Sequence, residues 1–257
     1  MIVRVTPFFI YIILTIIIFF FSFSKDFTKM DNNWEEYDTY WISNHEQASK
    51  EWFDTRKYRI TGSNYGAAIN HSNFSTPQET MKIVAGFYAK TFSDESLSNM
   101  RHGRETEPIA RDWYEKSKNC KVIERGIAIP KWNKYMGSSV DGEVIGQNGI
   151  IEIKCPKRMY RPLLEKSQSG ITYDKYYHKH IWDSHYDQMI GNMAVMNKEW
   201  CDYIVYSTFD SKVYLERIYF NEKYWNEVLY PGLKFFIEQL KKIIPEEPYV
   251  PPGYTNC

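Results

Sequence analysis

Cysteine, glycine and proline are all scarce in this 257-residue chain, with 4, 13 and 11 copies respectively. Four cysteines are too few for a disulfide-rich mini-protein, and so little glycine and proline excludes a collagen-like chain. The cysteines are Cys120, Cys155, Cys201 and Cys257, so there is no Cys-x-x-Cys pair and no zinc-ribbon spacing. We therefore expect free thiols.

An excess of charge of either sign is also absent. Lysine plus arginine total 32, as do aspartate plus glutamate, so the formal net charge is zero. Residues 1–29 hold three basic residues and one acidic residue, which leaves 29 basic and 31 acidic residues, a net charge of −2, in residues 30–257. This balance excludes a generally basic nucleic-acid coat. Any DNA binding must use a local positive channel.

Apolar material is plentiful. Hydrophobic residues make up 43% of the chain and aromatic residues 17%, which is enough for a buried core and excludes a wholly disordered chain. At about 150 residues per domain, the length corresponds to one or two domains. No internal repeat is present.

Residues 1–29 form a hydrophobic leader around the uncharged segment 8–23, whose 16 residues fall just short of the roughly 17–25 of a spanning helix. Extension back to Val5 gives 19 residues. Three interpretations stay open: a membrane anchor through residues 5–23, a signal segment, or a wrongly assigned start upstream of Met30. We leave the leader out of the fold prediction.

The body alternates helical and extended patterns. Helices are expected over residues 48–56, 64–70, 76–89, 103–116, 182–196 and 224–244. Strands are expected over residues 122–130, 135–145, 150–155, 203–206 and 213–220. Residues 91–100 read as a polar loop, and residues 245–257 as a proline-rich C-terminal tail. This order predicts one α/β domain over residues 30–244, with a central mixed β-sheet flanked by α-helices.

The most informative stretch is a predicted hairpin that carries Asp141, Glu152 and Lys154. Alternate residues of a strand share a face, so Glu152 and Lys154 point the same way. Folding the chain about the middle of residues 146–149 places Asp141 opposite Lys154, with Glu152 diagonal to it on the same face. Two carboxylates and an ammonium are therefore expected on one patch.

Two carboxylates beside a lysine suit the binding of a divalent metal ion. Carboxylates without histidine or cysteine suit a hard divalent ion such as Mg²⁺ or Mn²⁺. Such an ion offsets charge on a phosphate and lowers the pKa of a bound water, and a neighbouring lysine orients that water. The alternative is an ordinary surface Glu–Lys pair, worth less than about 1 kcal/mol.

The wider sequence resembles the YqaJ-type viral recombinase, or lambda-exonuclease-like, family of the PD-(D/E)XK nuclease superfamily. Five segments between Trp52 and Phe209 carry the resemblance in the family's order: residues 56–63 (Arg, then Ile-Thr-Gly-Ser), 102–107 (Gly-x-x-x-Glu), 139–142 (Ser-Val-Asp-Gly), 151–156 (Ile-Glu-Ile-Lys-Cys-Pro) and 186–188 (ending in Gln). Val140, Gly62 and Gly191 depart from the residues usual at their positions. The resemblance implies a restriction-endonuclease-like core.

The resemblance also implies a role for each matching residue. Asp141, Glu152, Glu107 and the backbone carbonyl of Ile153 would be ligands for two metal ions, and Lys154 would position or activate the attacking water. A pocket for a terminal 5′-phosphate would be formed by Arg56, Ser63, Ser139 and Gln188, whose forked and neutral donors suit phosphate oxygens.

Four of these residues also have a structural alternative. Glu107 could pair with Arg111 four residues on, and Ser63 could be only a helix N-cap. Arg56 and Gln188 could be solvated surface residues.

The function implied is a Mg²⁺- or Mn²⁺-dependent exonuclease that degrades one strand of linear double-stranded DNA from the 5′ end, in viral-type recombination or replication. A single-strand annealing protein as partner and a homotrimer are implied by the same resemblance. The alternatives are an endonuclease of the same superfamily and a nonenzymatic, membrane-tethered DNA-binding protein. The expected location is cytoplasmic or nuclear, with anchoring through residues 5–23 as the alternative.

Overall fold

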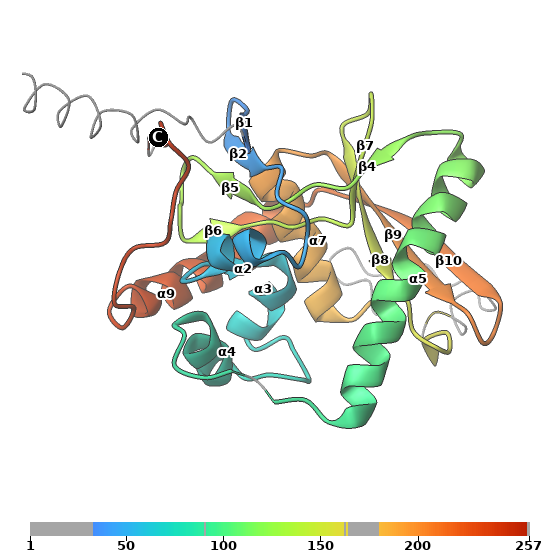
Figure 1. The fold of residues 1–257 in the computed structure, drawn as a ribbon, viewed down its shortest axis with the longest axis horizontal. Helices are drawn as coiled ribbons and strands as arrows, with labels where there is room; N and C mark the ends of the chain where they lie inside the picture. Colours follow the sequence, from blue (N-terminus) through green and yellow to red (C-terminus); the bar gives the residue numbers. More distant parts are fainter. Residues whose placement is uncertain (1–32, 90, 162, 164–179, 256–257) are drawn as a thin grey trace, which may run out of the picture. The chain divides into compact units, whose positions relative to one another are not determined.

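The computed structural model describes residues 33–89, 91–161, 163 and 180–255 (Figure 1). The leader of residues 1–29, with its anchor, signal and start-site interpretations, lies outside the described residues. In the part of the chain that is described, no helix has the length and apolar character needed to cross a membrane.

Helices and strands alternate along the described chain. The helical segments are α2 (Lys50–Arg56), α3 (Gly62–Ala68), α4 (Pro77–Val84), α5 (Asp94–Lys118), α7 (Asp183–Met196), α8 (Glu222–Tyr224), the π-helix η1 (Trp225–Leu229) and α9 (Tyr230–Leu240). The strands are β1 (Trp34–Glu36), β2 (Tyr40–Ser43), β3 (Ile60–Thr61), β4 (Val122–Ile123), β5 (Ala128–Pro130), β6 (Met136–Gly137), β7 (Gly142–Val144), β8 (Gly149–Lys154), β9 (Trp200–Ser207) and β10 (Lys212–Tyr219).

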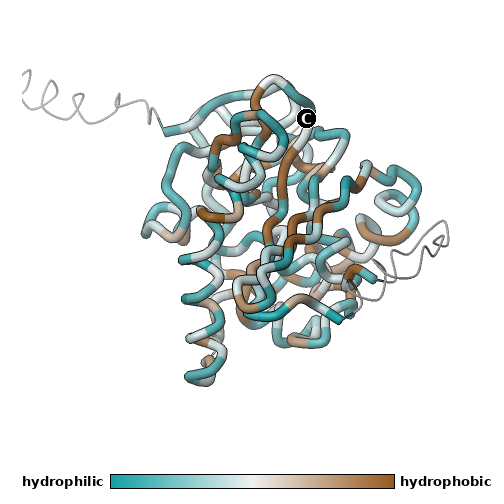
Figure 2. Tube along the Cα trace, turned by 90° about the vertical axis from the view of Figure 1, so that its right-hand side faces the viewer, coloured by the Kyte–Doolittle hydropathy of each residue, from teal (hydrophilic) through white to brown (hydrophobic). Residues whose placement is uncertain are grey.

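The central sheet has the strand order β10-β9-β8-β7-β4. Strands β8 and β9 are parallel, whereas the other neighbours are antiparallel. Two smaller sheets, β1-β2-β5 and β3-β6, lie outside it. The predicted α/β class with a mixed sheet and flanking helices is therefore confirmed, and the trace is hydrophobic mainly along the inner strands (Figure 2).

Alternation along β8 divides its side chains between two cores. Ile151 and Ile153 are buried with Tyr114 of α5 on one face. Ile150 on the other face joins the core that contains Met189 and Met193 of α7. Helices α5 and α7 thus cover opposite faces of the sheet (Figure 1), and polar residues of β8 that share the face of Ile150 point towards α7.

The predicted hairpin forms, but its register differs from the expected one by two residues. Gly142 pairs with Ile151, so Asp141 lies opposite Glu152 and not opposite Lys154. The turn between β7 and β8 covers residues 145–148, one position earlier than expected, and Gly146 within it has a φ of 73°, a conformation that glycine adopts readily. A shift of two residues leaves every side chain on its predicted face.

Three other predicted elements are divided or extended. The strand expected over residues 122–130 is split into β4 and β5, and the strand over 135–145 into β6 and β7, because the pieces pair in different sheets. Residues 94–100, predicted as loop, form the first turns of α5. Ser93 caps this helix by accepting a hydrogen bond from the Ser96 amide, and two acidic residues follow in the first turn.

The end of the chain packs against the domain. Tyr249 offers its backbone carbonyl to the buried Arg59 at 2.6 Å, and the Tyr254 hydroxyl donates to the carbonyl of Pro130 at 2.8 Å. Arg59 also donates to the carbonyl of Lys134 at 2.8 Å. Several backbone carbonyls therefore satisfy the donors of a cation that is 1% exposed.

Close packing of α3 on α7 explains why Gly191 replaces a larger residue. A Cβ at this position would lie 2.2 Å from Cδ2 of the fully buried Tyr65. We expect Gly191→Ala to lower the free energy of unfolding by about 1–3 kcal/mol through overpacking, as measured by urea denaturation.

Gly103 is the matched control, because it also lies inside a helix but has no atom within 4 Å of the site of a Cβ. Gly103→Ala should raise the free energy of unfolding by about 0.5–1 kcal/mol. Equal effects of the two substitutions would contradict the packing argument.

Candidate active site

The centre of the site lies between the end of β8 and the middle of α7. The Lys154 ammonium donates to Glu152 Oε1 at 2.6 Å and to Gln188 Oε1 at 3.0 Å. Asn192, one turn further along α7, donates to the other Glu152 oxygen at 3.5 Å. Gln188 is 8% exposed, so the alternative of a solvated surface residue is wrong.

Asp141 and Glu107 complete the acidic group. Asp141 Oδ2 accepts a hydrogen bond from the Ile153 amide at 2.6 Å, which fixes the carboxylate beside β8. Glu107 approaches on α5 and forms a 2.6 Å ion pair with Arg111. The expected Glu107–Arg111 alternative is thus present, but Arg111 also donates to the backbone carbonyl of Asp141 at 2.9 Å. Arg111 therefore ties α5 to the strand end that carries Asp141.

Crowding of these carboxylates in a buried place perturbs their ionisation. Burial, followed by the charge of Asp141, raises the pKa of Glu107 to about 7. Burial, with the charges of Asp141 and Glu107, raises the pKa of Glu152 to about 8 in spite of Lys154. Burial also raises the pKa of Asp141. Burial and mutual repulsion therefore make the charged form of these carboxyls costly, and they favour retention of protons near neutral pH.

Lys154 itself stays cationic. Burial lowers the pKa of its ammonium, but the nearby Glu152 and Asp141 carboxylates outweigh burial, and the net pKa is raised. Cys155 next to it is a neutral thiol at physiological pH, because burial raises its pKa to about 12. Lysine, and not cysteine, is thus the charged group of this strand end.

The acidic group suits a hard divalent ion by its chemistry. Three carboxylates and the Ile153 carbonyl are all-oxygen donors, and a bound cation would stabilise the charged form that burial disfavours. Each carboxylate is instead hydrogen-bonded to a protein donor, and within the described residues no three His, Cys, Asp or Glu side chains are grouped to hold a metal ion. The chemistry of the donor set therefore suits such an ion, whereas the present arrangement of its side chains satisfies protein donors.

The residues expected to bind a 5′-phosphate are linked through Trp52. Arg56 lies over the Trp52 ring, 4.2 Å from its centroid, and donates to Ser63 Oγ at 3.3 Å. The Trp52 indole donates to Ser139 Oγ at 3.1 Å. No carboxylate among the described residues forms an ion pair with Arg56. Its guanidinium is therefore stacked and positioned, but its charge is not neutralised.

Ser63 is not the N-cap that the alternative proposed. Helix α3 begins at Gly62, its N-cap is Thr61, and Ser63 is exposed in the first turn. Its hydroxyl is thus open to a ligand from the same side as Arg56.

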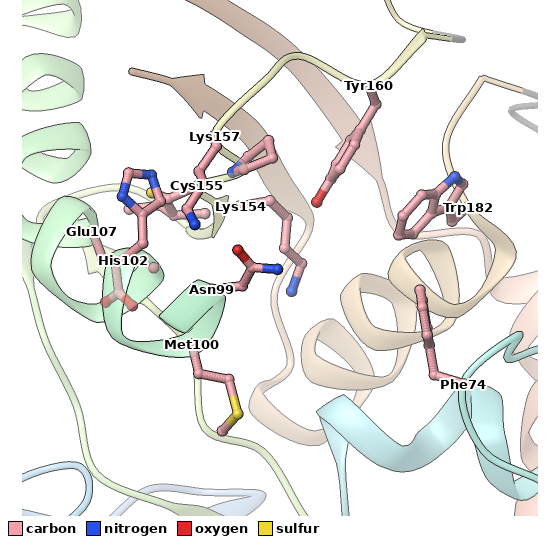
Figure 3. Close-up of a pocket in the computed structure, with 13 residues that line it drawn as sticks. Phe74, Asn99, Met100, His102, Glu107, Lys154, Cys155, Lys157, Tyr160 and Trp182 are labelled. Atoms are coloured by element: carbon pink, nitrogen blue, oxygen red, sulfur yellow. The ribbon is translucent and has the colours of Figure 1, made fainter. Parts of the chain in front are cut away.

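Two adjoining cavities connect these groups. A cleft of about 670 Å³ is lined by Glu107, Ile153 and Lys154, and a cavity of about 480 Å³ by Ser63, Gln188 and again Lys154. Figure 3 shows Lys154 between the side chains of α5 and the aromatic residues on the other side of the cleft. Lys154 thus borders both the acidic group and the side of the predicted phosphate pocket where Ser63 and Gln188 lie.

Four residues were assigned no role in the site from the sequence; three of them position other side chains and one lines both cavities. Trp52 and Arg111 join predicted site residues to one another, and Asn192 supports Glu152. Trp52 stands four residues before Arg56, a helical spacing that signals a shared face. Met100 lies in the segment mistaken for a loop and lines both cavities.

Comparison with known proteins places this architecture in a family. Residues 51–199 match the YqaJ-like viral recombinase domain. The structure is similar to an alkaline exonuclease, LHK-Exo, from Laribacter hongkongensis, with a TM-score of 0.58, 25% identity, and coverage of 76% of this chain and 93% of that chain. For the same protein in complex with dAMP, the TM-score is 0.60 and the identity 26%, with the same coverage. No curated protein matches the chain.

The fold and the strand-end cluster of two carboxylates and a lysine define a nuclease of the PD-(D/E)XK superfamily. Within that class the chain belongs to the YqaJ-like viral recombinase family, because the domain match covers more than half of its length. The family match and the similarity to an alkaline exonuclease support a nuclease of the exonuclease type.

Proposed function

We propose that this nuclease is a metal-dependent exonuclease that degrades one strand of linear double-stranded DNA from its 5′ end. The observation that carries the proposal is the position of Lys154, which contacts both Glu152 and Gln188 and borders both cavities. A phosphate bound beside Ser63 and Gln188 therefore lies next to the group that would support hydrolysis.

In this mechanism the protein's side chains hold the metal ions and orient the lysine that contacts the attacking water or a phosphate oxygen. Glu107, Asp141, Glu152 and the Ile153 carbonyl would hold Mg²⁺ or Mn²⁺, as the pair of ions that the family resemblance implies. Bound ions would activate water and offset phosphate charge. Lys154, as an ammonium, donates a hydrogen bond to the attacking water or to a phosphate oxygen. Gln188 and Glu152 hold the ammonium in place.

Polarity follows from the phosphate pocket. Arg56, Ser63, Ser139 and Gln188 would bind a terminal 5′-phosphate, which fixes the first nucleotide and presents the next phosphodiester bond to Lys154. An internal phosphodiester offers one fewer free oxygen to these donors than a terminal phosphate does, and it carries less negative charge. A duplex labelled at either end of one strand tests the direction: release of the 5′ label before the 3′ label is expected, and the reverse order would contradict it.

The preference for a phosphorylated end should depend on Arg56. We expect the full chain to degrade 5′-phosphorylated duplex about 10- to 100-fold faster than the same duplex with a 5′-hydroxyl. This ratio corresponds to the free energy of one charge-assisted hydrogen bond. Arg56→Ala should remove this ratio by slowing only the phosphorylated substrate, and Arg56→Lys should keep part of it. An unchanged ratio in Arg56→Ala would exclude Arg56 from the pocket.

The family resemblance supports three further proposals. A homotrimer, a single-strand annealing protein as partner, and a role in viral-type recombination at a cytoplasmic or nuclear replication site would suit an enzyme that exposes single strands. Light scattering of the full chain tests the first, with a mass of three 30.7-kDa chains as the expected result.

A further inference from the structure

Three aromatic side chains line one side of the cleft next to Lys154 (Figure 3). Tyr160 and Trp182 are stacked, with ring centroids 4.7 Å apart and an interplanar angle of 30°. Phe74 lies 5.8 Å from Trp182. The rings come from three separate segments: the connection between α3 and α4, the chain after β8, and the N-cap residue just before α7. We call Phe74, Tyr160 and Trp182 the aromatic wall.

The wall is continuous with both cavities of the site. Phe74 lines the 480 Å³ cavity as well as the 670 Å³ cleft, and so does Lys154. Phe74 is 67% exposed, so its ring is not needed to fill the core. A DNA backbone at Lys154 would therefore have its bases within reach of an exposed ring.

The charges around the wall suit a polyanion. Among the described residues that line the two cavities, Glu107 is the only carboxylate, although the chain as a whole has as many acidic as basic residues. The other polar lining residues are chiefly lysine, histidine, serine and asparagine or glutamine. A nucleic-acid strand is thus a better occupant than an acidic or purely apolar peptide.

We propose that Phe74 and Trp182 bind an unpaired base of the DNA strand held at Lys154, by stacking on its face. Aromatic stacking accepts any base, because every base has a π-face, and this suits an enzyme that must move along any sequence. The inference rests on the proposed function and deepens it, since a base can reach the wall only after it has left its partner. The duplex end is therefore open inside the cleft.

Photochemical cross-linking tests this contact directly. The full chain is mixed in EDTA, so that cleavage is absent, with a 5′-phosphorylated duplex that carries 5-iododeoxyuridine at one of the first three 5′ positions. We expect cross-links to Phe74 or Trp182, identified by peptide mass spectrometry. Cross-links confined to residues outside the aromatic wall would overturn the proposal.

Substitutions at Phe74 separate stacking from packing. Phe74→Ala and Phe74→Leu should both weaken binding of the duplex about tenfold in EDTA, whereas Phe74→Tyr should bind as the wild type does. Phe235→Ala is the matched control: Phe235 is 71% exposed on α9 and lines a different groove, so its loss should leave binding unchanged. Wild-type affinity in Phe74→Leu would show that apolar volume suffices and would contradict stacking.

Failure of this proposal differs from failure of the proposed function. Metal-dependent degradation without cross-links to the wall would overturn the stacking proposal alone. Cross-links to the wall in a protein that hydrolyses no DNA with Mg²⁺ or Mn²⁺ would support stacking and overturn the exonuclease proposal.

Discussion

Replacement of Lys154 by methionine should lower kcat for DNA hydrolysis by about 10²–10³-fold, the typical loss when one donor to a developing charge is removed. Methionine keeps the apolar length of the side chain but cannot donate to the attacking water or to a phosphate oxygen. It also leaves Gln188 and Glu152 without the ammonium that they hold at 3.0 and 2.6 Å. Steady-state kinetics on linear duplex DNA gives the effect.

A separate binding measurement distinguishes chemistry from recognition. Lys154→Met should still bind duplex DNA, because Arg56, Ser63 and the rest of the phosphate pocket are intact. Lys116→Met is the matched control, since Lys116 is 75% exposed near the end of α5 and pairs with Asp112, a pair that contributes little. A Lys154 variant with wild-type kcat would remove Lys154 from the mechanism.

Substitution of Glu152 by glutamine should stabilise the protein in EDTA at pH 8, although it should abolish activity. The pKa of Glu152 is raised to about 8 by burial and by neighbouring carboxylates. Between the ordinary carboxyl pKa and pH 8, the native state therefore binds a proton that the unfolded state has lost, and stability falls as pH rises. Glutamine removes this penalty, and we expect Tm to rise by about 3–6 °C.

The same substitution at Glu143 should have the opposite sign. Burial alone would raise the pKa of Glu143, but hydrogen bonds from Lys198 at 2.6 Å and Arg125 at 3.0 Å outweigh it and lower the pKa. Glu143→Gln leaves both cations without their carboxylate and should lower Tm.

Thermal melts from pH 5 to pH 8 compare the Tm of the wild type with those of Glu152→Gln and Glu143→Gln. Stability of the metal-free wild type should decline over this range more steeply than that of Glu152→Gln, and Mg²⁺ should raise the Tm of the wild type only. If Tm declined with pH equally steeply in the wild type and in Glu152→Gln, the raised pKa of Glu152 would be contradicted.

Local signals predicted most of the elements correctly. The helix expected from residue 76 begins with a capping box, in which Thr76 accepts from the Glu79 amide and Glu79 accepts from the Thr76 amide. Capping depends only on residues three positions apart. The placement of Glu152 and Lys154 on one face also survived a two-residue error in register, since the period of a strand is two. Properties set by neighbours along the chain were therefore predictable.

Contacts between distant segments were not predictable in the same way. Residues 122–130 alternate like one strand, yet β4 pairs with β7 and β5 with β2, and alternation does not specify a partner. Trp52 became part of the site only because α2 places it beside Ser139, 87 positions away. The start of α5 was missed although Ser93 and the following acidic residues are an N-terminal signal.

The central claim is that residues Asp141, Glu152 and Lys154 support metal-dependent hydrolysis from a DNA end. The most direct measurement incubates the full chain with 5′-phosphorylated linear duplex and with covalently closed circular duplex, in Mg²⁺ and in EDTA, beside Lys154→Met. We expect loss of the linear DNA alone, only in Mg²⁺, and not with the variant. Cleavage of the closed circle would indicate an endonuclease, and binding of DNA without cleavage of either substrate would contradict the catalytic assignment.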